Sequence, residues 1–193
     1  MDVVIVYESL YGNTRSVAEA IAEGFRGTRP DAIVTVLGVD QASTEQVNRV
    51  DLLVVGGPTH ILRMTTPRTR RMSPRPSDDG GDDLVSQKGD VGEAGMGVRE
   101  WLNVLPDAVS ASQAAAFDTR LGSVFAGGAA RSISRRLRAH GYHIVTAPKG
   151  FIVSGNEGPL KSGEYDRAQL WGVRLARLCS ARRLRGTRGE VAS

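Results

Sequence analysis

Short apolar runs alternate with amphipathic segments along most of this chain, and that alternation is the strongest constraint on its fold. The run Val3–Tyr7 is almost continuously apolar, which is typical of a parallel strand covered on both faces. The segment that follows it, Thr14–Arg26, carries its apolar residues at helical spacing. Strands that alternate with helices predict an α/β fold built on a parallel sheet.

The alternation continues as far as residue 179. Further strands are predicted at Ile33–Val39, Asp51–Val55, Gln113–Phe117 and Tyr142–Val153, the last interrupted near Pro148. Further helices are predicted at Gly97–Leu105, Ala129–Ala139 and Glu164–Cys179. A chain of 193 residues suits one domain. We place that domain at residues 1–180 and expect a basic tail at 181–193.

The stretch Ile61–Met96 breaks this rhythm. It consists mainly of Thr, Pro, Arg, Ser, Asp and Gly, and it lacks the apolar residues needed to fold alone. A connection of this length is usually either a functional lid or a disordered loop. We expect a mostly disordered insertion that begins beside the functional site.

The chain is basic, with a net charge of +4, and its positive charge is nearly all arginine. Arginines cluster at residues 63–75, 131–138 and 182–188. Such runs are usually solvated faces, and nucleic-acid binding is the alternative interpretation. No helix-turn-helix, zinc-ligand or aromatic RNA-binding signature accompanies them, so we expect no nucleic-acid partner.

Three features indicate the compartment. No apolar run approaches the ~20 residues of a membrane helix, so no membrane span is expected. The N-terminus has no basic n-region and no small-residue cleavage site, so no secretory leader is expected, and the single Cys179 has no disulfide partner within the chain. We therefore expect a cytoplasmic protein in which Cys179 is a core residue.

The loop Ser9–Thr14, with the sequence SLYGNT, joins the first predicted strand to the first predicted helix. The N-terminus of a helix offers unpaired N–H groups and a dipole that favours an anion. Ser9, Asn13 and Thr14 add side-chain donors, and Gly12 lets the backbone curve around a ligand. The loop has neither the lysine of the nucleotide-hydrolase loop nor a GxGxxG pattern. It fits a terminal phosphate monoester, and a simple capped turn is the alternative.

The stretch VYESLYGNT followed by SVAEAI resembles the phosphate-loop signature of the flavodoxin family, an aromatic-x-S/T-x-x-G-x-T pattern. DLLVVGGPTH and AAFDTRLG resemble the two flavin-flanking segments of that family, in the same order. The resemblance covers about residues 1–180. It implies a flavodoxin-like doubly wound sheet of five parallel strands, in the order 2-1-3-4-5, and bound FMN.

The resemblance also implies the residues that hold FMN. The loop Ser9–Thr14 surrounds the phosphate, with side-chain donors from three of its residues and backbone contacts from Leu10, Tyr11 and Gly12. Two further groups are implied to border the isoalloxazine, namely Pro58, Thr59 and His60 on one side and Phe117, Asp118, Thr119 and Arg120 at the pyrimidine end. His60 is a candidate catalytic residue, either as a proton relay or as a polar stacking surface. Arg120 either touches the flavin or pairs with Asp118.

The departures from the flavodoxin pattern bear on function. Electron-carrier flavodoxins are acidic and enclose the flavin between aromatic side chains, whereas this chain is basic and has His60 at the first of those places. Positive groups at His60, Arg63 and Arg120 are expected to favour the doubly reduced flavin anion. This predicts an oxidoreductase that passes electrons from NAD(P)H or a reductase to a small aromatic or quinone-like acceptor. A non-enzymatic electron shuttle and a basic interaction module with a vestigial flavin site are the alternatives.

Overall fold

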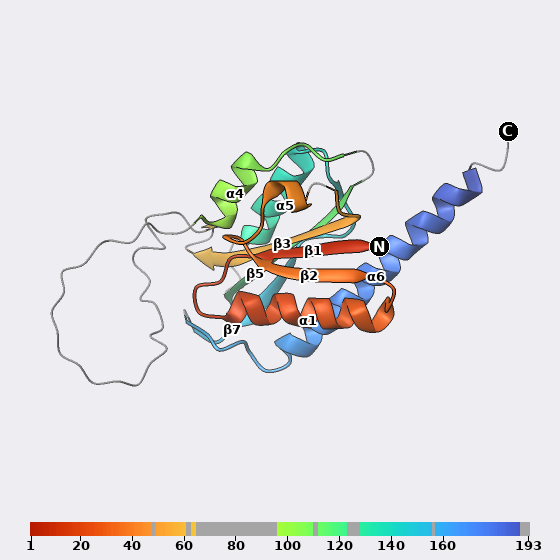
Figure 1. Ribbon diagram of the computed structural model, residues 1–193. Helices are drawn as coiled ribbons and strands as arrows, with labels where there is room; N and C mark the ends of the chain where they lie inside the picture. Colours follow the sequence, from red (N-terminus) through yellow and green to blue (C-terminus); the bar gives the residue numbers. More distant parts are fainter. Residues whose placement is uncertain are drawn as a thin grey trace, which may run out of the picture.

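A computed structural model describes residues 1–47, 49–60, 63–64, 96–109, 112–122, 128–155 and 157–189. Strands and helices alternate along these residues, as Figure 1 shows. In chain order the elements are β1 (Asp2–Tyr7), α1 (Asn13–Thr28), β2 (Ile33–Gly38), α2 (Thr44–Val47), β3 (Leu52–His60), β4 (Arg63–Met64), α4 (Val98–Val104), β5 (Gln113–Leu121), α5 (Ala129–Ala139), β6 (His143–Ile144), β7 (Lys149–Val153) and α6 (Glu164–Gly189).

The sheet has the strand order β2-β1-β3-β5-β6, and β7 also pairs with β5. Pairing is parallel throughout this set, and β4 is the one strand among the described residues that runs antiparallel, against the end of β3. The predicted order 2-1-3-4-5 and the α/β class are thereby confirmed. The fifth predicted strand is divided into β6 and β7, with Pro148 in the break. Proline has no N–H to donate to a strand ladder, which accounts for an interruption there.

Helices cover both faces of the sheet (Figure 1). Alternate residues of β1 point to opposite faces, so Val3 and Ile5 join the cluster with α1 and α6. Val4 and Val6 join the cluster on the other face, which includes residues of α4 and α5. Both clusters are buried, and this explains why the central strands have nearly continuous apolar sequences.

The first and last helices, α1 and α6, pack against each other with almost no space between their backbones. A Cβ atom added at Gly24 of α1 would lie 1.9 Å from the carbonyl oxygen of Gln169. A Cβ atom added at Gly172 of α6 would lie 2.1 Å from the carbonyl oxygen of Ile21. Glycine at these two positions therefore permits the contact.

Several boundaries differ from the sequence predictions. β3 and β5 continue to His60 and Leu121, so the second and third predicted flavin loops are largely strand. The short elements α2 and β4 were not predicted, and β4 places Arg63–Met64, part of the predicted insertion, beside the end of β3. Residues 65–95 of that insertion lie outside the described residues. Beyond Cys179, α6 continues through Gly189, so much of the predicted tail is helical.

Candidate functional site

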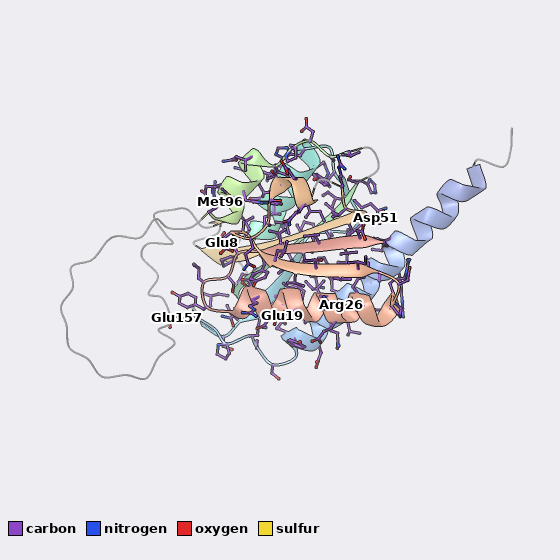
Figure 2. All side chains as sticks on the ribbon, in the orientation of Figure 1. Glu8, Glu19, Arg26, Asp51, Met96 and Glu157 are labelled. Carbon is purple, nitrogen blue, oxygen red and sulfur yellow. The ribbon has the colours of Figure 1, made fainter. Side chains whose placement is uncertain are left out.

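The three segments predicted to form the site meet at one edge of the sheet. β1, β3 and β5 are parallel neighbours, so their carboxyl ends lie together. The backbone N–H of Glu8 donates to the carbonyl of Gly56 at 3.0 Å, which ties the first segment to the second. Figure 2 shows Glu8, Met96 and Glu157 toward this end of the molecule and Asp51 toward the other.

The loop before α1 turns through a left-handed backbone conformation at Gly12. Gly12 caps the helix with φ 79°, in the left-handed region where glycine is favoured, and a Cβ added there would meet no atom within 4 Å. The carbonyl of Gly12 accepts hydrogen bonds from the N–H of Ser16 at 2.9 Å and from its hydroxyl at 3.2 Å. The Ser9 hydroxyl accepts the N–H of Arg15, the third residue of α1, at 3.4 Å. Gly12 has no side chain to cap the helix, and within the described part of the chain the N–H groups of Asn13 and Thr14 have no side-chain acceptor.

Asn13 and Thr14 are held by partners distant in sequence. The Asn13 amide donates to the carbonyl of Glu157 at 2.8 Å. The Thr14 hydroxyl forms a buried hydrogen bond with the Thr119 hydroxyl at 2.8 Å. An amide nitrogen has two N–H groups, and two hydroxyls share one proton between them while the other is left to donate. The Asn13 contact leaves one amide N–H free to donate to an anion. In the threonine pair the free proton lies on the hydroxyl that accepts, so Thr14 can donate to an anion when Thr119 donates to it.

The N-terminus of α4 is occupied by a carboxylate of the chain itself. An Oε atom of Glu8 accepts the N–H of Val98 at 2.9 Å, and Glu8 is 5% exposed. Glu100 accepts the N–H of Gly97 at 3.2 Å, which completes the cap. Glu8 was not among the predicted site residues, although it lies directly between β1 and the loop.

The N-terminus of α5 is occupied in the same way. The Thr59 hydroxyl accepts the N–H of Ala129, and an Oδ atom of Asp118 accepts the N–H of Ala130, both at 2.9 Å. Asp118 is fully buried, and this burial raises the pKa of its carboxyl above the ordinary 3.8. Its second oxygen lies 3.6 Å from Nε of Arg120.

These caps distinguish α1 from its two neighbours at the same edge. In α4 and α5 the first N–H groups are satisfied by Glu8, Thr59 and Asp118. In α1 the neutral Ser9 hydroxyl accepts the N–H of Arg15 at 3.4 Å, and the N–H groups of Asn13 and Thr14 have no side-chain acceptor among the described residues. The positive end of the α1 dipole is therefore the one that this edge offers to an anion.

Two of the predicted flavin-bordering side chains have other surroundings. The ring of Phe117 is fully buried among Phe151 and Trp171, with centroids 6.3 Å from each, so this side chain does not border a ligand at the edge. It lies directly over Gly56, where an added Cβ would be 2.0 Å from the ring. Asp118, the next residue, points to the opposite face and caps α5, because side chains alternate along a strand.

The remaining predicted residues lie at or beside the edge. Pro58 and Thr119 pair across β3 and β5, and Pro58 is half-buried. Thr59 is half-buried beside them, and its hydroxyl accepts the N–H of Ala129 in α5. His60 ends β3 opposite Arg63, but the side chains of both lie outside the described residues. Arg120 pairs with Asp118, so one of the positive groups expected at the flavin is offset by a buried carboxylate.

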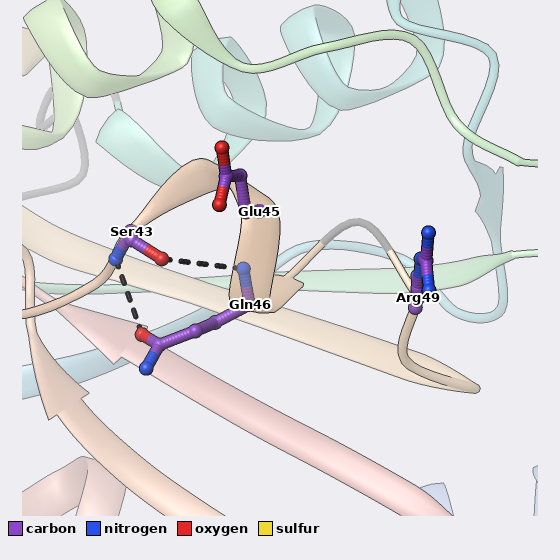
Figure 3. A pocket seen from close by; sticks show the side chains of 4 residues that line it. All are labelled: Ser43, Glu45, Gln46 and Arg49. Carbon is purple, nitrogen blue, oxygen red and sulfur yellow. Dashed lines mark hydrogen bonds between the residues drawn. The ribbon is translucent and has the colours of Figure 1, made fainter.

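An open depression of about 740 Å³ lies elsewhere, beside α2. It is lined by Ser43, Glu45, Gln46 and Arg49, and Figure 3 shows two hydrogen bonds between Ser43 and Gln46. None of the predicted site residues lines it. The described residues contain no group of three or more His, Cys, Asp or Glu side chains placed to bind a metal. None of the helices, in the part of the chain that the structure describes, is long and apolar enough to cross a membrane.

Comparison with known proteins matches the first third of the chain to one family. The flavodoxin family model matches residues 5–61. The flavodoxin of Aquifex aeolicus is 39% identical over 59 residues. That match spans 31% of this chain and 31% of the relative's length. Proteins of this family bind FMN.

Solved structures share the fold over nearly the whole chain. An archaeal flavodoxin has a TM-score of 0.62 at 18% identity, over 93% of this chain and 99% of its own. Flavodoxin 1 of Bacillus cereus has a TM-score of 0.62 at 13% identity, over 92% and 98%. A WrbA-like flavodoxin of Agrobacterium tumefaciens has a TM-score of 0.54 at 17% identity, over 93% and 98%. The resemblance and the fold predicted from the sequence are thereby confirmed.

Proposed function

We propose that this flavodoxin-like chain binds FMN at the carboxyl edge of its sheet and uses it to transfer electrons. The observation that carries the proposal is the N-terminus of α1, which follows an open turn at Gly12 and in which the N–H groups of Asn13 and Thr14 have no side-chain acceptor among the residues that the structure describes. The matching region of the family model, residues 5–61, includes this loop.

The donor set fits a phosphate monoester. Neutral hydroxyl, amide and backbone N–H groups converge at residues 9–14, and the α1 dipole adds a favourable field. Ser9, Asn13 and Thr14 would donate to the phosphate, and the bonds of Asn13 to Glu157 and of Thr14 to Thr119 would hold them in place. When bound, FMN supplies the chemistry, because its ring accepts and releases one or two electrons.

The ring is proposed to lie over the ends of β3 and β5. Pro58, Thr119 and the backbone at Arg120 would border it, and His60 would stack on it or donate a hydrogen bond. Asp118 and Thr59 act indirectly in this arrangement, since they fix α5 against the same edge. One domain over residues 1–180, with the insertion at 61–96, remains part of the proposal.

We further propose a small aromatic or quinone-like acceptor, with NAD(P)H or a reductase as electron donor. The basic composition and the histidine at a position where flavodoxins have an aromatic residue support this. The pairing of Arg120 with Asp118 lowers the positive charge available to the ring and so reduces the expected preference for the doubly reduced flavin anion. An electron shuttle that docks protein partners is the second candidate, favoured by that same pairing.

The first experiment is a titration of the purified chain with FMN, riboflavin and FAD, followed by flavin fluorescence. FMN should bind most tightly, because riboflavin lacks the phosphate and FAD carries a larger diphosphate group. Equal affinity for FMN and riboflavin would refute the phosphate site. Steady turnover of a quinone by NAD(P)H in the FMN-loaded protein would then separate the enzyme from the shuttle.

A further inference from the structure

The exposed side of α5 carries a row of arginines that the proposed FMN site does not use. Arg131, Arg135 and Arg138 are all exposed and lie at positions i, i+4 and i+7, which share one helix face. We call these three residues the arginine stripe. It extends over about 10 Å of helix. The opposite side of α5 is buried, with Ile133 and Leu137 in the core.

Two other arginines of the molecule form short ion pairs within the chain, and in the part of the chain that the structure describes the stripe arginines form none. On α1, Arg15 forms an ion pair with Glu19 at 2.8 Å, and after α1 Arg29 forms one with Asp31 at 2.8 Å. Among the described residues, no acidic side chain forms an ion pair with any member of the stripe. The stripe is therefore a concentrated positive surface.

Local helix electrostatics oppose the first part of the stripe and favour its last member, because Arg138 lies in the last turn of α5. Arg131 lies in the first turn of α5, where the helix dipole is positive and a cation is unfavourable. Like charges at i and i+4, such as Arg131 and Arg135, also repel each other. The buried carboxylate of Asp118 partly offsets the first effect. The unfavourable charge at Arg131 and its repulsion with Arg135 are not explained by the stability of the helix, which favours a role in binding.

The stripe begins beside the proposed flavin. α5 starts at the carboxyl edge, where Thr59 and Asp118 hold its N-terminus. Exposed apolar side chains lie near the same edge, with Met96 before α4 and Leu121 at the end of β5 exposed by 48% and 42%. Apolar groups flanked by charges are typical of the surface of a protein–protein contact.

We propose that the arginine stripe docks an acidic protein that exchanges electrons with this chain. The proposal rests on the proposed function, and it specifies the electron donor as a protein of opposite charge. Complementary charge would raise the association rate and orient the partner toward the carboxyl edge. A membrane surface fits less well, because the apolar side of α5 is buried against the sheet and is not available to insert into lipid. Nucleic acid also fits less well, because three cations neutralise few phosphates.

The test compares two triple variants that change the net charge equally. One is Arg131→Gln/Arg135→Gln/Arg138→Gln. The control is Arg49→Gln/Arg174→Gln/Arg177→Gln, whose arginines are exposed and lie outside α5. The FMN-loaded full chain is mixed in a stopped-flow instrument with a reduced, acidic [2Fe–2S] ferredoxin as probe, over a range of ionic strength. The affinity of the same ferredoxin for the flavin-free chain is measured by calorimetry.

The stripe variant should react roughly tenfold more slowly at low ionic strength and show a weaker salt dependence, while the control stays within about twofold of the wild type. Equal effects of both variants, or no effect of either, would overturn the proposal. It would also be overturned if the stripe variant lost binding only to a DNA duplex or to phosphatidylserine vesicles. If the chain binds no FMN, the proposed function fails, and the calorimetric comparison still decides whether the stripe docks the acidic protein.

Discussion

Replacing Thr14 with valine tests the phosphate site at its most specific contact. Thr14 lies in the first turn of α1, it is 2% exposed, and its hydroxyl bonds to that of Thr119 at 2.8 Å. Valine has nearly the same shape, so the variant removes one donor and leaves the packing in place. We expect two separable effects, one on FMN affinity and one on stability.

The expected size of each effect follows from the kind of hydrogen bond lost. A hydrogen bond to a charged group contributes about 1.5–3 kcal/mol, so FMN should bind roughly ten- to a hundredfold more weakly. In the absence of FMN the same substitution leaves the buried Thr119 hydroxyl without its partner. This should lower the free energy of unfolding by about 1–3 kcal/mol.

Fluorescence titration with FMN and riboflavin measures the first effect, and urea unfolding of the flavin-free protein measures the second. Riboflavin affinity should stay within about twofold of the wild type, because riboflavin has no phosphate to lose contact with Thr14. Thr14→Ser is the matched control, since it keeps the hydroxyl and should retain most of the FMN affinity. Thr119→Val breaks the same buried bond and should destabilise the protein similarly, but it should weaken FMN binding less.

Two outcomes would refute the reasoning. Unchanged FMN affinity in Thr14→Val would show that this hydroxyl does not reach the phosphate. Equal weakening of FMN binding in Thr14→Val and Thr119→Val would show that the pair acts only by shaping the loop.

Three further predictions concern the edge and the core. Burial raises the pKa of Asp118 above 3.8, so the native state holds this proton more tightly than the unfolded state, and the stability of the wild type relative to Asp118→Asn should fall as pH rises from 3.8 through the raised pKa. A constant difference between the urea unfolding midpoints of the two proteins across pH 3.5–7 would contradict this. Gly56→Ala would place a methyl group against the ring of Phe117 and should destabilise the protein by about 1–3 kcal/mol in thermal unfolding. The double variant Gly56→Ala/Phe117→Leu should recover part of this stability, and equal stability of the single and double variants would exclude the clash. Cys179 is 2% exposed, and burial raises its pKa to about 11, so the native protein should react with a thiol reagent at pH 8 far more slowly than the protein unfolded in urea. Rapid labelling of the native protein would argue against this burial.

The periodicity of the sequence was sufficient to locate the main helices and strands, and the resemblance to flavodoxins supplied the strand order. The predicted bounds Ala129–Ala139 coincide with those of α5, because apolar spacing and the following Gly141 both mark that helix. The ends of β3 and β5 could not be found in this way. Gly56, Gly57 and Pro58 have no strand preference, and they are extended because they pair with residues 117–119 of the neighbouring strand.

The candidate site was predictable in part. The loop at residues 9–14 carries a specific motif, and the structure gives it the expected position before α1. The orientation of Asp118 could have been inferred from strand alternation, because Ala114 and Ala116 lie on the α5 face and Asp118 follows at the same spacing. The role of Glu8 could not, since its partner Val98 is 90 positions away and no local pattern connects them.

The close contact of α1 with α6 has a consequence for how the protein is made. The helix that follows the proposed FMN loop rests on a helix that is synthesised much later, and Gly24 and Gly172 bring the two backbones together. While the ribosome still holds the C-terminal segment, α1 lacks the surface that covers one of its sides. At about 5–20 residues per second, residues 29–163 take about 7–27 seconds to synthesise between the two helices. The N-terminal third of the chain, which carries the proposed cofactor motif, is therefore made well before α1 gains the surface against which it packs in the folded protein.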